Sequence, residues 1–202
     1  MRLERGRAMG WAFWLVGATI TYNVIEGGVA LWSGSEAGSI ALFGFGLDSV
    51  IECAAAGVLL WRLLVETHSH DEERVEQAER RVLRFVGITF LALAAYVISQ
   101  ATITLVSRGE PGTSLVGIVL AAASLVVMPV LATAKLRVAA RMGSGALAAE
   151  AKETLACAYL SFALLTGLLL HSLLGWWWAD PVAALFMVPW LVWEGVEGVR
   201  GE

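Results

Sequence analysis

The chain has 202 residues, of which 58% are hydrophobic and 16% charged, and its mean hydropathy is +0.71. These values exclude an ordinary water-soluble domain and indicate an integral membrane protein, in contact with the lipid bilayer along most of its length. The formal net charge of −4 implies no nucleic-acid partner, because such partners are bound by strongly basic surfaces.

Six apolar segments follow one another along the chain, and each is long enough to cross the hydrocarbon core as a helix. The sequence therefore predicts an all-α protein, an integral membrane six-helix bundle that forms a single transmembrane domain over residues 1–202, with no cytoplasmic C-terminal domain. The predicted spans are 11–32, 38–64, 85–106, 113–134, 150–174 and 180–199.

Basic residues outside the predicted spans lie almost entirely on one side of the membrane. Three precede the first span, five lie between Arg62 and Arg84, and three lie between the fourth and fifth spans, whereas the opposite side carries Arg108 alone. Because Lys and Arg favour the cytoplasmic side, both termini are predicted to be cytoplasmic. We expect a multi-pass protein of a bacterial inner (plasma) membrane. Asp180 followed by Pro181 predicts the start of the last helix.

Acidic side chains interrupt the apolar segments in two places with the same spacing. Asp48 and Glu52 lie one helical turn apart in the second span, and Glu153 and Cys157 lie one turn apart in the fifth. A carboxylate at mid-membrane costs about 2.5–3.5 kcal/mol, so each pair must face protein or water. Two such pairs brought face to face make a four-ligand cation site, which is the tetrahedral arrangement that zinc prefers. We therefore predict a metal site at these residues.

Ion pairing within the membrane is not expected to neutralise these acids. Lys152 is the only base placed within reach of the spans, and it lies on a different helical face from Glu153. Glu194 and Glu197 lie near enough to the end of the last span for solvent to explain them. Asn23 and Glu26 in the first span, and Glu150 in the fifth, are candidates for a secondary or proton-relay role, with helix packing as the alternative.

Three motifs together resemble those of the cation diffusion facilitator (cation efflux) transporters, six-helix proteins that export divalent metals, and the pattern covers most of the chain. They are Ser39 with Asp48 and Glu52, the stretch from Ala149 to Ser161, and the DPVAAL sequence from Asp180 to Leu185. The N-terminal YNVIEG at residues 22–27 resembles more closely the branch of small bacterial members and the vertebrate transmembrane protein 163.

The resemblance implies that Asp48, Glu52, Glu153 and Cys157 are the metal ligands of a transporter, which is not an enzyme. It also implies exchange of metal for protons and a homodimer formed through the membrane helices. The third span offers small residues for that contact: Ala92, Ala94, Ala95 and Ser99.

Three features depart from the usual family pattern. Glu153 and Cys157 replace a His and an Asp, and the cytoplasmic C-terminal domain and the histidine-rich loop between spans four and five are missing. In some relatives the loop after the second span holds an auxiliary metal site. His68, His70 and Asp71 are the candidates for such a site here, with an ordinary solvated loop as the alternative.

A sulfur ligand among oxygen ligands favours Zn²⁺ as the transported substrate, with Fe²⁺, Mn²⁺, Co²⁺ and Cd²⁺ as further candidates. The sequence thus predicts a divalent metal efflux transporter that works by Zn²⁺/H⁺ antiport with alternating access. Two other hypotheses stay open: a metal-binding membrane subunit or regulatory partner that does not transport, and a proton-coupled carrier of organic cations.

Overall fold

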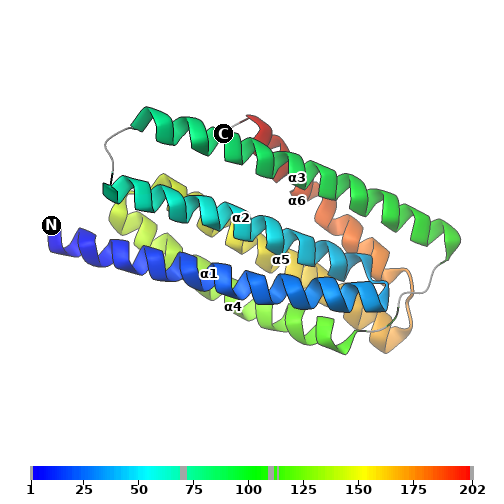
Figure 1. Cartoon of the computed structure of the whole chain (residues 1–202). Helices are drawn as coiled ribbons and strands as arrows, with labels where there is room; N and C mark the ends of the chain where they lie inside the picture. The colour runs from blue at the N-terminus through cyan, green and yellow to red at the C-terminus, as the bar shows by residue number, and fades with distance from the viewer. Residues whose placement is uncertain (1, 69–71, 109–111, 113, 201–202) are drawn as a thin grey trace.

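The computed structural model describes residues 2–68, 72–108, 112 and 114–200 (Figure 1). Within these residues the chain forms six α-helices and no strand. The helices are α1 (Arg2–Ala37), α2 (Ile40–His68), α3 (Glu72–Ser107), α4 (Leu115–Met142), α5 (Gly145–Leu174) and α6 (Ala179–Arg200).

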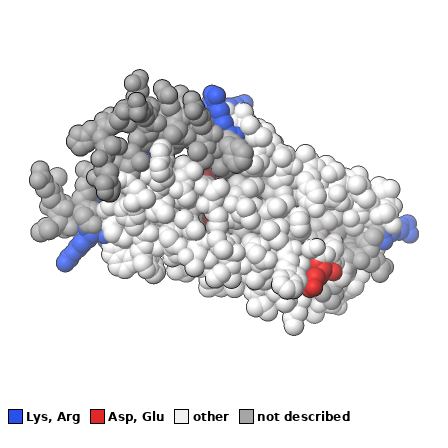
Figure 2. Space-filling view, in the orientation of Figure 1, with Lys and Arg blue, Asp and Glu red and all other residues white. Residues whose placement is uncertain are grey.

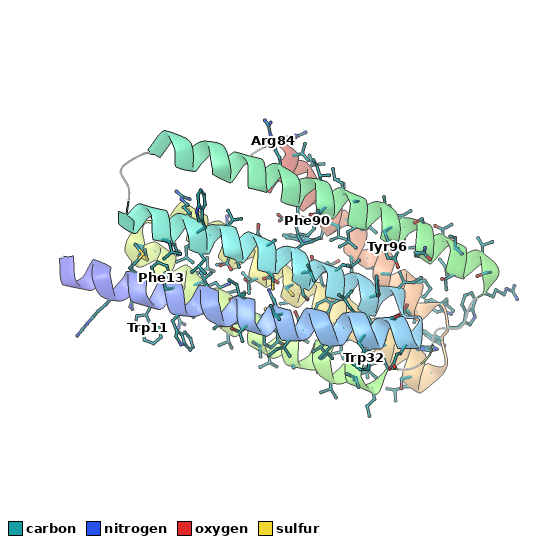
Figure 3. The ribbon with its side chains drawn as sticks, viewed as in Figure 1. Trp11, Phe13, Trp32, Arg84, Phe90 and Tyr96 are labelled. Carbon is teal, nitrogen blue, oxygen red and sulfur yellow. The ribbon has the colours of Figure 1, made fainter. Side chains whose placement is uncertain are left out.

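All six helices are long and apolar enough to cross a membrane, so the predicted all-α, six-span architecture is confirmed. Successive helices alternate in direction, and the two ends of the chain therefore lie toward the same end of the bundle (Figure 1). Trp11 lies in the N-terminal third of α1 and Trp32 lies near its C-terminal end, and both side chains are exposed (Figure 3). Indole rings at these two levels fit the two membrane interfaces.

One difference from the predicted spans bears on the site: α4 continues to Met142 instead of ending at 134. Gly143 ends it in the left-handed conformation, with φ of 66°, and Ser144 then caps α5 by accepting a hydrogen bond from the Leu147 amide. Nothing stops the helix earlier, because Lys and Arg are good helix formers. As a result Lys135, which was assigned to a loop, lies inside α4 and is fully buried.

The bundle consists of a group of four helices and a separate pair. Helices α1, α2, α4 and α5 pack together, and α3 packs against α6 on the side where α2 and α5 lie (Figure 1). Seen in Figure 2, the described Lys and Arg side chains lie toward the margins of a broad uncharged surface. That surface is the face expected to contact lipid.

The α3–α6 pair is held at short range by two glycines. A Cβ atom at Gly87 would lie 2.6 Å from the Val199 backbone nitrogen and 2.7 Å from the Gly195 carbonyl oxygen. Small residues at a crossing let two membrane helices approach backbone to backbone. Gly87 and Gly195 therefore permit the close backbone contact between the two helices.

The small residues proposed for a dimer contact on α3 do not all face outward. Ala92, Ala95 and Ser99 are exposed, whereas Ala94 is only 2% exposed and belongs to the core. The inclusion of Ala94 was wrong, because its position on the helix turns it toward the rest of the bundle.

Candidate metal site

The four predicted ligands line one small pocket between the four-helix group and the α3–α6 pair. Asp48 and Glu52 reach it from α2, and Glu153 and Cys157 reach it from α5. The one-turn spacing in each helix places each pair on a single face, as the sequence indicated. The remaining lining residues are Ala55, Phe90, Ala156, Trp190 and Glu194.

Burial increases from one side of the pocket to the other. Asp48 is 6% exposed, Glu52 5% and Cys157 1%, while Glu153 and Glu194 are partly exposed. Phe90 of α3 points inward from its helix toward this region (Figure 3). The pocket therefore has a closed end near Cys157 and a mouth near the two glutamates.

The Glu52 carboxylate lacks hydrogen-bond partners in the structure. Both of its oxygens are buried, and neither has a partner within hydrogen-bonding distance. Leaving such a group unsatisfied is costly, so it calls for a proton, a water molecule or a cation. Carboxylate oxygens and a thiolate sulfur are donors that suit a divalent transition metal.

In this structure the candidate ligands of the described residues are too far apart to enclose an ion. Among the described residues, no three His, Cys, Asp or Glu side chains lie close enough together to hold a metal. Coordination would therefore require the side chains, or the helices that carry them, to draw closer.

A second polar layer lies behind the pocket and is organised around Glu26 of α1. Its carboxylate accepts hydrogen bonds from Ser49 of α2, at 2.9 Å, and from Ser124 of α4. The Tyr22 and Ser124 hydroxyls lie 2.7 Å apart, and the Cys157 sulfur is 3.9 Å from Glu26 Oε2. The Cys157 side chain thus contacts Glu26 and also lines the pocket.

Asn23 is fully buried, and neither polar atom of its side chain has a hydrogen-bond partner. The Asn23 amide and the Glu52 carboxylate are thus two buried polar groups of the described residues that lack hydrogen-bond partners. Cys53 lies elsewhere, with its thiol 3.6 Å from the Ile20 carbonyl oxygen.

Glu150, a candidate for a secondary or relay role, does not line the pocket. Its Oε1 atom pairs with Lys135 Nζ at 2.6 Å, and the same ammonium donates to Thr154 at 2.9 Å. The prediction that Lys152 is the only base within reach was wrong, because α4 carries Lys135 into the bundle. Lys152 itself is exposed.

Asp180 joins α6 to the start of α2. The helix begins at Ala179, so Asp180 lies inside its first turn instead of before it. Its carboxylate accepts hydrogen bonds from the Ser39 hydroxyl and, at 3.0 Å, from the Ile40 amide. The Ser39 and DPVAAL motifs are therefore two halves of one contact, and Asp180 caps a neighbouring helix.

The candidate auxiliary metal site after α2 lies largely outside the described residues. His68 is the last residue of that helix, and His70 and Asp71 lie outside the described residues. The auxiliary metal site at these residues stays a prediction.

Glu194 was not among the predicted site residues, because it was expected, like Glu197, to lie near solvent at the end of the last span. The structure puts Glu194 on the pocket wall, one turn after Trp190, which also lines it. The signal that could have found it is an acid placed directly after the apolar run VPWLVW, where a span would otherwise continue.

Comparisons with known proteins agree with the fold. A family model described as the cation efflux transmembrane domain matches residues 16–199. A protein of Synechocystis sp. named as an uncharacterized transporter is 25% identical over 176 residues, which cover 86% of this chain and 57% of that protein. The chain thus spans little more than half of the length of this relative. The cation efflux family points to a transporter and not to an enzyme.

Proposed function

The chain belongs to the cation efflux family, and on that premise we propose that it exports a divalent metal ion, with Zn²⁺ as the main substrate, in exchange for protons. The transport site is the pocket of Asp48, Glu52, Glu153 and Cys157. The observation that carries this proposal is the convergence of these four side chains, from two helices, on one pocket in the bundle.

The donor set supports Zn²⁺ as the substrate. Three carboxylates alone would suit hard cations such as Mg²⁺ or Mn²⁺, whereas the Cys157 sulfur adds the soft ligand that Zn²⁺ and Cd²⁺ accept. Fe²⁺, Co²⁺ and Mn²⁺ are secondary substrates. Zinc sites built from Cys and carboxylate ligands are normally four-coordinate, which matches the number of side chains offered.

Protons are the natural counter-substrate because a metal binds only to the deprotonated forms of these groups. Thiol and carboxyl groups that release protons on metal binding take them up again when the metal leaves. Metal and protons therefore occupy the same atoms in turn. Exposing the pocket alternately to the two sides of the membrane couples their movements in opposite directions.

The division of the bundle supports this mechanism. The pocket has ligands from α2 and α5 on one wall and Phe90, Trp190 and Glu194 from the α3–α6 pair on the other. A shift of the pair against the four-helix group would change access to the pocket without breaking either group. We place both termini in the cytoplasm of a bacterial cell and expect a homodimer that uses the exposed face of α3.

Flux measurements test the proposal. Purified protein in liposomes with an imposed pH gradient should move Zn²⁺, and Asp48→Ala should abolish this flux while leaving thermal stability unchanged. Glu36→Ala removes an acid from an exposed position and should transport like the parent. An Asp48→Ala protein with parental flux would refute the site. Metal binding without flux would favour a metal-binding subunit or regulatory partner, and flux of an organic cation instead of metal would favour a carrier of that kind.

A further inference from the structure

Glu194 of α6 differs from its neighbour Glu197, although both lie near the same end of the helix. Glu197 accepts a hydrogen bond at 2.5 Å from the indole of Trp193, on an exposed part of the surface. Glu194 instead lines the pocket that holds Asp48, Glu52, Glu153 and Cys157. The helix thus turns one acid toward lipid headgroups or solvent and the other toward the candidate metal site.

Glu194 and Glu153 face the same pocket from two different helices, α6 and α5, and Asp48 of α2 lines it as well. Like charges facing one confined space repel each other unless a cation or proton lies between them. Glu153 and Glu194 are both partly exposed, so this pair forms the mouth of the pocket.

The closed end of the same pocket gives an independent indication of a ligand. Glu52 is 5% exposed, lines the pocket and has no hydrogen-bond partner for either oxygen. An acidic mouth therefore leads to an unsatisfied buried carboxylate and a thiol. A cation that enters between the two glutamates would find further ligands deeper in the pocket.

We propose that Glu194 is an additional metal-binding residue, which captures a divalent cation together with Glu153 at the mouth of the pocket before the ion reaches Asp48, Glu52 and Cys157. This assignment rests on the proposed transport function. Its consequence is that α6 takes part in binding: an ion held between α5 and α6 ties the α3–α6 pair to the four-helix group. Capture of the ion is then linked to the position of the α3–α6 pair relative to the four-helix group.

The test compares Glu194→Gln with Glu197→Gln, which removes the same charge from the same helix one turn away. In liposomes with a pH gradient, Glu194→Gln should raise the KM for Zn²⁺ about tenfold or more and change kcat much less, because a charged ligand is lost from the capture step. Glu197→Gln should stay within about twofold of the parent. Glu194→Asp keeps the carboxylate and should recover part of the loss.

Direct binding gives a second readout. Cd²⁺ bound to a thiolate has a charge-transfer absorption in the ultraviolet, which reports on Cys157. Glu194→Gln should need more Cd²⁺ to reach half of this signal and still reach the parental maximum. Equal titrations for the parent, Glu194→Gln and Glu197→Gln would overturn the assignment, and so would a parental KM.

These outcomes separate the two proposals. Binding that depends on Glu194 in a protein that shows no flux would refute transport and keep Glu194 as a ligand. Zn²⁺ flux that is independent of Glu194 would refute this inference and keep the transport function. A parent that binds neither Zn²⁺ nor Cd²⁺ would refute both.

Discussion

Replacing Lys135 with methionine should destabilise the protein by about 3–5 kcal/mol, the usual cost of removing one partner from a buried ion pair. Methionine fills a similar volume but has no ammonium group. The substitution therefore removes the 2.6 Å contact with Glu150 and the 2.9 Å hydrogen bond to Thr154. Glu150 is only 4% exposed and would be left with an unpaired carboxylate. Its Oε2 atom already lacks a hydrogen-bond partner in the parent.

The double variant Lys135→Met/Glu150→Gln should be more stable than Lys135→Met. Exchanging a whole buried ion pair for uncharged groups is often close to neutral, because the cost of burying both charges disappears with the pair. We expect the double variant to recover most of the loss, which gives a coupling energy of about 2–3 kcal/mol in a double-mutant cycle.

Reversible unfolding in mixed detergent micelles, followed by the fluorescence of the nine tryptophans, would measure these free energies. Lys152→Met is the matched control, since it removes an exposed lysine and should change stability by no more than about 0.5 kcal/mol. A loss below about 1 kcal/mol for Lys135→Met, or a double variant no more stable than the single one, would refute the buried pair.

Three further predictions concern packing, capping and metal preference. Gly87→Ala should lower the thermal unfolding temperature by forcing α3 and α6 apart, at a cost of about 1–3 kcal/mol; Gly17→Ala, where a Cβ would meet no atom within 4 Å, should be neutral or slightly stabilising, and equal behaviour of the two would contradict the close crossing. Asp180→Asn should cost about 1 kcal/mol by weakening the cap on the Ile40 amide; amide exchange at the start of α2 should rise, and unchanged exchange would argue against the cap. Cys157→Ser should weaken Zn²⁺ and Cd²⁺ binding much more than Mn²⁺ binding, because the soft ligand is lost; a competition titration checks this, and a parallel loss for all metals would speak against sulfur coordination.

The spans and the two ligand pairs were predictable because both depend on local properties of the chain. Apolar length alone identifies a membrane helix, and the one-turn spacing of Asp48 with Glu52, and of Glu153 with Cys157, fixes each pair on one side of its own helix. That the two pairs line the same pocket was a hypothesis at that stage, since spacing cannot tell which helix a face will meet. In the structure α2 packs against α5, and this packing brings the two pairs to the same pocket.

Sequence by itself determined six membrane helices, because hydrophobic length and helical periodicity are read along a single segment. Only the tertiary structure decided that Lys135 pairs with Glu150, that Asp180 caps α2 instead of its own helix, and that Glu194 faces the pocket while Glu197 does not. Each of these depends on the rotation of one helix relative to another. Such rotations are set by how all six helices pack together, and no single segment encodes them.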